Sequence, residues 1–211
     1  MTDPPYEIRA GNGGGVFGKR DSLVNTGGFT DSGVNYSFLD TFNSWFCFCS
    51  LSQLSELLKK SYSLCEHTNL LSWCKPNPLP TCCNKYLPDV EFIVHGFKSK
   101  RLFGDYKTKS SFHLHPCGNK ETKHPNEKPI PVIHRLLRLG SLDGETVLDP
   151  FLGSGTTAVA CEQLNRRWIG IEISEKYCEI AAKRIERERQ QLKLFGPVAE
   201  RPPKPFQESM F

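Results

Sequence analysis

The sequence has no long hydrophobic run, and its cysteines follow no pattern typical of a disulfide-rich protein. Apolar residues never approach the roughly 18 consecutive positions that a membrane-spanning helix needs. The nine cysteines are an odd number and include no CxxC spacing, which argues against a disulfide framework. The first residues also lack the basic and then apolar run of a secretion signal. We therefore expect an intracellular, cytoplasmic protein with reduced thiols.

A metal site has little support. His113, His115 and Cys117 could bind zinc together with Cys82 or Cys83, because histidine and cysteine are the usual ligands of that metal. The other interpretation is that these are ordinary loop residues. We favour it and predict no metal.

Length and charge indicate one domain with a basic segment. At 211 residues and 38% hydrophobic content, the chain can form one complete core but not two comfortable domains. Residues 98–123 contain seven Lys or Arg and two acidic residues, a local excess of +5 that is larger than the +4 of the whole chain. This segment also carries Phe103, Tyr106 and Phe112, a composition suited to phosphate contact and base stacking. The alternative is a solvated basic loop.

Periodicity predicts the elements of the first two thirds. Short apolar runs predict strands at 44–49, 69–74 and 90–96, and a helical apolar face predicts a helix at 51–62 with a capping box of Ser50 and Gln53. Pro129 and Pro131 open a helix that runs through Leu139. The basic segment lacks both periods and should be a loop or small insert. Residues 7–36 are rich in glycine and polar residues and suit an active-site loop.

The most regular part of the chain follows. A strand at 146–148, a helix at 156–164, a strand at 168–171 and a helix at 175–193 succeed one another with short connections. This alternation predicts an α/β fold with a doubly wound, mostly parallel sheet. We expect residues 1–194 to form one catalytic domain, and the proline-rich residues 195–211 to be a disordered tail.

A glycine-rich turn marks a ligand site in that fold. Residues 149–157 read Asp-Pro-Phe-Leu-Gly-Ser-Gly-Thr-Thr and join a strand to a helix, where open parallel sheets bind ligands. Glycine lets a ligand approach the backbone, and the helix N-terminus offers free N–H groups. Glu172 ends the next strand, where a carboxylate can accept from both hydroxyls of a ribose. Alone, the turn could be only a tight connection.

A second signal is Asp3-Pro4-Pro5-Tyr6. Two prolines fix the backbone and remove two donors, so the Asp3 carboxylate and a neighbouring carbonyl can both accept from one amine. Tyr6 offers a flat face for stacking. The segment suits a planar ring that carries an NH₂ group, although four such residues can also be a rigid extended tail.

Together these motifs resemble those of the N4/N6 amino DNA methyltransferases, in the permuted class where the catalytic motif precedes the cofactor motif. The resemblance spans Asp3 to Arg184. It rests on Asp-Pro-Pro-Tyr at 3–6, His-Pro-Asn-Glu-Lys-Pro at 124–129, the glycine turn at 149–157 and the acidic Glu172. It implies a Rossmann-like fold, S-adenosylmethionine as cofactor, and transfer of its methyl group to the exocyclic amine of a flipped base in double-stranded DNA.

The resemblance also implies roles for individual residues. The catalytic residues would be Asp3, Pro4, Pro5 and Tyr6. The cofactor would be lined by Lys128, Asp149, Phe151, Gly153, Ser154, Gly155, Thr156 and Glu172, with Lys128 near its carboxylate end and Asp149 beneath its methionine part. The basic segment lies where this family places target recognition, so Lys98, Lys100, Arg101, Lys107 and Lys109 would contact DNA.

One departure from the family is that only Met1 and Thr2 precede Asp3, where relatives have an apolar central strand. A missing strand leaves unpaired edges, so either the gene product is shortened or another segment fills the gap. Asp at the first motif position favours adenine N6, and cytosine N4 is the alternative. A shortened, inactive DNA-binding relative is a third interpretation. A nicotinamide dehydrogenase is disfavoured, because Gly-x-Gly-x-x-Gly is not completed.

The last five residues, Gln207–Phe211, resemble the peptides that dock on bacterial sliding clamps. The alternative interpretation is that the tail is an inert linker. We therefore expect DNA as the main partner, a nucleoid-associated location, and a clamp as an optional second partner.

Overall fold

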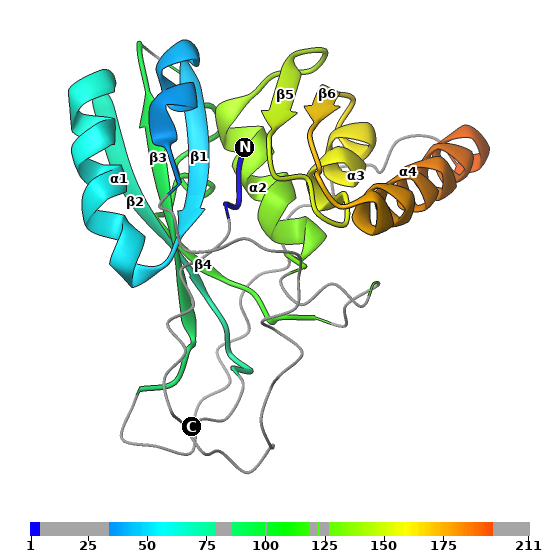
Figure 1. Ribbon diagram of the computed structural model, residues 1–211, viewed down its shortest axis with the longest axis horizontal. Helices are drawn as coiled ribbons and strands as arrows, with labels where there is room; N and C mark the ends of the chain where they lie inside the picture. The colour runs from blue at the N-terminus through cyan, green and yellow to red at the C-terminus, as the bar shows by residue number, and fades with distance from the viewer. Residues whose placement is uncertain (5–33, 79–85, 100, 119–121, 123–126, 196–211) are drawn as a thin grey trace.

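The computed structural model describes residues 1–4, 34–78, 86–99, 101–118, 122 and 127–195 (Figure 1). Several predictions fall outside this part of the chain. They concern Pro5, Tyr6, Cys82, Cys83, Lys100, most of the glycine-rich loop, and the tail from 196 with its Gln207–Phe211 peptide.

The described elements are strands and helices, which alternate strictly from α2 onward. In chain order they are η1 (Tyr36–Thr41), β1 (Ser44–Cys49), α1 (Leu51–Leu64), β2 (His67–Cys74), β3 (Val90–Phe97), β4 (Phe112–Leu114), α2 (Ile130–Gly140), β5 (Thr146–Asp149), α3 (Thr156–Gln163), β6 (Arg167–Gly170) and α4 (Glu175–Phe195). The predicted strands and helices are confirmed to within a few residues. The Gln53 side chain accepts from the Ser50 N–H at 3.1 Å, as the predicted capping box requires.

Two elements were not predicted. Residues 36–41 form a 3-10 helix, η1, which begins where the predicted loop of residues 7–36 ends. Within the basic segment, Phe112–Leu114 forms β4, which pairs in parallel with β2, so that segment is not entirely loop. Both elements are too short for a periodic pattern to show, and β4 exists because β2 offers it an edge.

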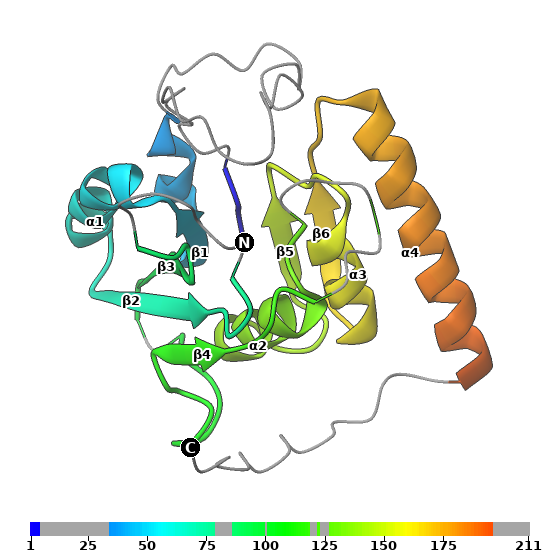
Figure 2. The ribbon, with the colours of Figure 1, turned by 90° about the horizontal axis from the view of Figure 1, so that it is seen from below.

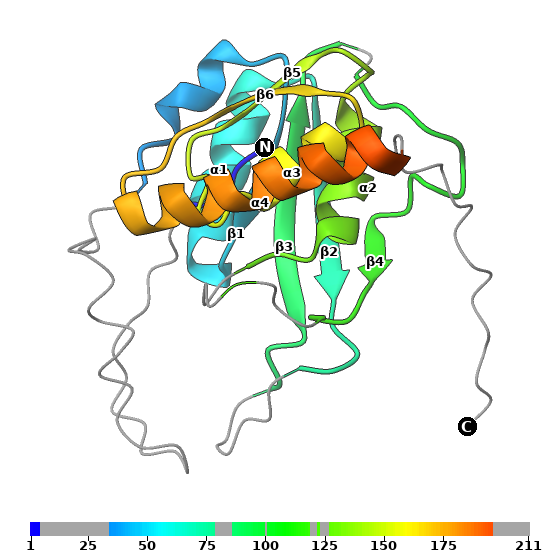
Figure 3. The same ribbon diagram turned by 90° about the vertical axis from the view of Figure 1, so that its right-hand side faces the viewer.

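The strands form a mixed sheet in which β3 is reversed. The order is β1-β3-β2-β4, with β3 antiparallel to both neighbours, and β5 and β6 form a separate parallel pair. Because β1 and β2 are both antiparallel to β3, they run in the same direction, and β4, which is parallel to β2, runs in that direction too. The mostly parallel, doubly wound architecture is thus confirmed, and Figure 3 shows helices on both faces.

Alternate residues of β1 serve two cores. Phe46 and Phe48 face α2 in a cluster that includes Leu136 and Val147. Trp45 and Cys47 face the other way, among residues of η1 and α1. Both faces of β1 are therefore buried, which is why its sequence reads as a continuous apolar run.

The N-terminal residues lie between the two sheets (Figures 1 and 2). The Thr2 N–H donates to Phe46 O at 2.9 Å, and Thr2 O accepts from the Phe48 N–H at 3.0 Å. On the other side, the Met1 ammonium donates to Leu148 O of β5 at 3.0 Å. Among the described residues, β1 and β5 thus belong to separate sheets, and Met1 and Thr2 connect the two.

Among the described residues, no helix combines the length and the apolar character needed to cross a bilayer.

The buried His95 of β3 predicts a loss of stability in mild acid. It is 1% exposed, its ring stacks on Phe46 at 3.9 Å, and burial lowers its pKa from 6.5 to about 3. Below pH 6.5 the unfolded chain takes up a proton that the folded chain refuses, so stability falls as the pH drops towards 3. Between pH 7 and pH 5 we expect His95 to cost about 2 kcal/mol of unfolding free energy.

Urea unfolding at the two pH values measures this loss. The comparison is with His95→Gln, which cannot titrate and should lose about 2 kcal/mol less over the same interval. Equal losses in the two proteins would contradict the prediction.

Candidate active site

Asp3 is held at the carboxyl end of β1 by a buried lysine. Lys128, just before α2, is 7% exposed, and its Nζ lies 2.6 Å from Asp3 Oδ2. The same Nζ lies 3.3 Å from Glu91 Oε2 and 5.0 Å from the centre of the Phe48 ring. The neighbouring Pro4 is fully buried. The first four residues are thus packed into the protein and do not form a rigid tail.

The charges in this cluster stabilise one another. Burial disfavours the charged form of Lys128, but Asp3 and Glu91 outweigh burial and raise the pKa of the ammonium. Burial alone would raise the pKa of Glu91, yet Lys128 and Lys75 lower it. The ammonium and the Glu91 carboxylate therefore both stay charged at neutral pH.

The glycine turn follows β5 directly and takes a backbone course that only glycine adopts freely. Gly153 and Gly155 have φ of 56° and 85°, and Gly155 is the N-cap of α3. A Cβ on Gly155 would lie 2.9 Å from the Cβ of Ala181 and 3.1 Å from its Cα. The turn therefore requires glycine both for its dihedral angles and for the close approach of α4.

Glu172 holds this turn in place. Its carboxylate accepts from the Gly153 N–H and from the Ser174 N–H, each at 2.8 Å. A carboxylate has about four lone-pair directions, so these bonds leave it able to accept from ligand hydroxyls as well.

A buried arginine fixes the far side of the turn. Arg184 of α4 donates to Ser154 O at 2.8 Å and to the hydroxyls of Ser154 and Thr156 at 3.1 and 3.2 Å. Its other nitrogen pairs with Glu127 at 3.2 Å, and both side chains are almost fully buried. The sequence reading missed Arg184 and Glu127 as site residues. Glu127 stands inside the 124–129 motif, which was the one available signal.

Asp3 and the glycine turn lie at the same edge of the molecule. Met1 bonds to β5 one residue before Asp149, and Glu127 of the turn network precedes Lys128 of the Asp3 cluster. Burial raises the pKa of the Asp149 carboxyl, and the negative charge of Asp3 raises it further, while the Met1 ammonium lowers it. Phe151 N–H donates to Asp149 Oδ1 at 3.1 Å. The structure thus brings the two predicted motifs together.

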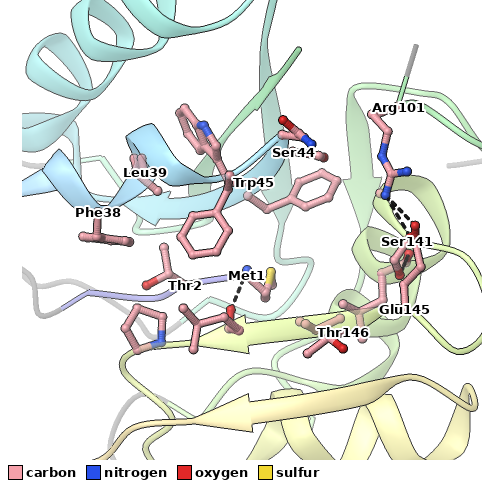
Figure 4. A pocket seen from close by; sticks show the side chains of 18 of the residues that line it. Met1, Thr2, Phe38, Leu39, Ser44, Trp45, Arg101, Ser141, Glu145 and Thr146 are labelled. Carbon is pink, nitrogen blue, oxygen red and sulfur yellow. Dashed lines mark hydrogen bonds and ion pairs between the residues drawn. The ribbon is translucent and has the colours of Figure 1, made fainter. Parts of the chain in front are cut away.

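A cavity of about 350 Å³ lies at the opposite end of β1 and β5, bordered by Ser44 and Thr146 (Figure 4). Met1 closes it towards Asp3. Arg101 and Glu145 form a bidentate ion pair at 2.8 and 2.9 Å on its wall. Of the predicted site residues that the structure describes, only Arg101 lines this cavity, so it is not the predicted active site.

The predicted DNA contacts are not all brought to the active edge. Lys98 follows β3, where its N–H donates to Asn43 O beside the amino end of β1, and Arg101 lies near Thr146. Asp3 lies at the other end of these strands. Lys107 and Lys109 are exposed on the turn that follows, and Tyr106 is 94% exposed. We therefore assign neither Lys98 nor Arg101 a contact near the target base.

The weak metal candidates do not assemble within the described residues. The rings of His113 and His115 lie 5.9 Å apart, and burial lowers the pKa of His113 to about 4. No group of three or more metal-ligating side chains occurs in the described ranges.

Fold and site define a class of protein, namely α/β proteins with a glycine turn at the carboxyl end of one parallel strand and an acidic residue after the next. Residues 1–183 match the profile of the N6/N4 DNA methylases, which is most of the chain. The chain belongs to this family.

Curated relatives match parts of the chain. It is 42% identical over 76 residues to the type II methyltransferase M.HpaI of Haemophilus parainfluenzae, covering 36% of this chain and 24% of the relative. It is 44% identical over 139 residues to the type II methyltransferase M2.DpnII of Streptococcus pneumoniae, covering 58% and 52%. The chain thus spans about half or less of the length of these relatives.

Solved structures agree with the fold. A complex of M1.HpyAVI with S-adenosylmethionine has 30% identity and a TM-score of 0.58, over 67% of this chain and 74% of that one. The PvuII DNA methyltransferase, described as cytosine-N4-specific, has a TM-score of 0.61 over 90% of this chain and 82% of its own. At 16% identity the second likeness shows the fold alone.

Proposed function

We propose that the chain transfers a methyl group from S-adenosylmethionine to the exocyclic amine of a DNA base, with adenine N6 as the first choice. The observation that carries the proposal is the placement of Asp3. Its carboxylate lies beside a buried ammonium at the edge of the sheet where the glycine turn of β5 opens. Catalytic carboxylate and cofactor loop would then act on one bound base.

The residues of the turn fit the cofactor. The free N–H groups at the start of α3 and the close backbone at Gly153 and Gly155 suit a ligand with a carboxylate and a nucleoside. Glu172 would accept from the ribose hydroxyls while it still holds Gly153. When bound, the cofactor supplies an electrophilic methyl group on a sulfonium. The M1.HpyAVI complex supports this choice of cofactor.

Asp3 would orient the attacking nitrogen. Delocalisation into the base ring weakens the lone pair of an exocyclic amine. Hydrogen bonds from that amine to the Asp3 carboxylate and the Pro4 carbonyl favour a more tetrahedral nitrogen, whose lone pair points at the methyl group. The nitrogen forms its bond to the methyl carbon as the sulfur–carbon bond breaks, and the extra proton leaves to Asp3 or water. No cysteine nucleophile is needed.

The amine lies inside a duplex, so the target nucleotide must rotate out of the stack before it can react. Tyr6 would then stack on the extruded base, and Lys107, Lys109 and Tyr106 would contact the surrounding DNA. Docking of Gln207–Phe211 on a sliding clamp is a separate proposal that the catalytic one does not need.

The test is methyl transfer from labelled S-adenosylmethionine to DNA, followed by digestion to nucleosides and mass spectrometry. We expect N6-methyldeoxyadenosine. N4-methyldeoxycytidine would support the alternative base. The PvuII enzyme, which is described as cytosine-N4-specific, has a similar fold. Absence of both products together with absence of saturable cofactor binding by calorimetry would favour the inactive DNA-binding interpretation.

A further inference from the structure

The Asp3 carboxylate and three charged side chains behind it form a continuous series of alternating charge. Lys128 Nζ lies 2.6 Å from Asp3 and 3.3 Å from Glu91, and Lys75 Nζ lies 2.6 Å from the second oxygen of Glu91. The side chains of Lys128, Lys75 and Glu91 are 7%, 12% and 21% exposed. Nothing in the sequence reading singled out Glu91 or Lys75.

We propose that Glu91 is a positioning residue for methyl transfer: it fixes Lys128, and Lys128 in turn orients the carboxylate of Asp3. This inference rests on the proposed function and names a part of its machinery. Glu91 would touch neither base nor cofactor. Its effect passes through Lys128.

Lys128 holds the Asp3 carboxylate directly, with 2.6 Å between Nζ and Oδ2. The preceding residue, Thr2, is anchored to β1 by two backbone hydrogen bonds. Lys128 can orient the Asp3 carboxylate only if its own four-carbon side chain is fixed, because a long lysine side chain otherwise samples many conformations.

Glu91 is well placed to fix that side chain. It lies in β3, where it pairs with Trp73 of β2, and the next residue, Phe92, pairs with both β1 and β2, so the sheet holds its backbone in place. Lys75 holds its other oxygen, which keeps the carboxylate in one orientation. The Phe48 ring lies 5.0 Å from Lys128 Nζ and limits its movement. Rigidity is thus passed from the sheet to Glu91, to Lys128 and to Asp3.

A proton relay along the same chain is disfavoured. Lys128 would have to become neutral, and the two carboxylates beside it both stabilise its charged form. These side chains therefore keep their charges during the reaction and hold Asp3 in position.

The test compares steady-state methyl transfer by the wild type, Glu91→Gln and Glu91→Asp. Glu91→Gln keeps the shape but removes the charge that holds Lys128, so kcat should fall about tenfold or more with KM for S-adenosylmethionine unchanged, since small misplacement of a catalytic group is costly. Glu91→Asp keeps the charge and should recover most of the loss.

The matched control is Glu162→Gln. Glu162 also accepts from two side chains, Trp168 Nε1 at 2.9 Å and Arg189 Nη2 at 2.6 Å, but it lies on α3 away from Asp3. This variant should keep the wild-type kcat, and thermal unfolding of all variants shows whether they are folded.

Two results would overturn the inference. One is an active wild type with Glu91→Gln at the same kcat. The other is a fall in kcat that Glu91→Asp does not recover and that follows the loss of thermal stability, because a purely structural role gives that pattern. An inactive wild type is a different result, since it removes the proposed function itself.

Discussion

Replacing Asp3 with alanine should lower kcat for methyl transfer by on the order of 100- to 1,000-fold, because it removes the acceptor that orients the target amine. Cofactor affinity should stay within about twofold of wild type, because Asp3 is not among the residues that hold the glycine turn. Single-turnover transfer of labelled methyl groups to DNA measures the first quantity. Calorimetry with S-adenosylmethionine measures the second.

Asp3→Asn makes this test sharper. The amide can still accept from Lys128 through its oxygen, so the local structure is retained, but its NH₂ group would face the amine of the base and two donors cannot pair. Asp3→Asn should therefore be nearly as inactive as Asp3→Ala. Asp143→Asn, at a carboxylate that is 72% exposed and paired with Arg166, should keep full activity. If Asp3→Asn transferred methyl groups at the wild-type rate, the assigned role of Asp3 would be wrong.

The elements of the fold could be predicted wherever a pattern was long enough to repeat. The alternation from 146 to 193 and the apolar run of β1 correspond to elements that local periodicity and burial determine together. β4 could not be predicted, since its three residues are a strand only because β2 lies beside them. The bridge made by Met1 and Thr2 is likewise a property of two open strand edges, which no local pattern encodes.

Some residues of the candidate site could likewise be predicted from the sequence, and others could not. The glycines and Glu172 stand in motifs whose chemistry can be recognised from residue types alone. The partners of Lys128 could not be, because Asp3, Glu91 and Lys128 are far apart in the chain and meet only after folding. The family resemblance implied that Lys128 lies near the cofactor carboxylate, whereas in the structure its ammonium lies 2.6 Å from the Asp3 carboxylate. The position of Lys98 and Arg101 at the opposite end of the strands also follows from the reversed direction of β3, which the sequence did not indicate.

The cofactor side of the site is tested most sharply at Glu172. Its carboxylate accepts two backbone N–H groups, and each such charged hydrogen bond contributes about 1.5–3 kcal/mol. Removing it in Glu172→Ala releases the turn at Gly153 and also deletes the acceptor for the ribose hydroxyls. Losing the free energy of one such bond lowers the affinity for the cofactor by about 10- to 100-fold, and losing both bonds lowers it further.

We therefore expect the Kd for S-adenosylmethionine to rise at least about 100-fold in Glu172→Ala, as measured by calorimetry. Glu172→Gln keeps one oxygen acceptor but turns an NH₂ group towards one of the two N–H groups, so its Kd should lie between those of Glu172→Ala and the wild type. Glu175→Ala removes an exposed carboxylate three residues further on, in the first turn of α4, and should leave Kd unchanged. A wild-type Kd in Glu172→Ala would mean that the cofactor does not occupy this turn. Because Asp3→Ala should spare cofactor binding and Glu172→Ala should weaken it strongly, the two variants separate the catalytic half of the site from the cofactor half.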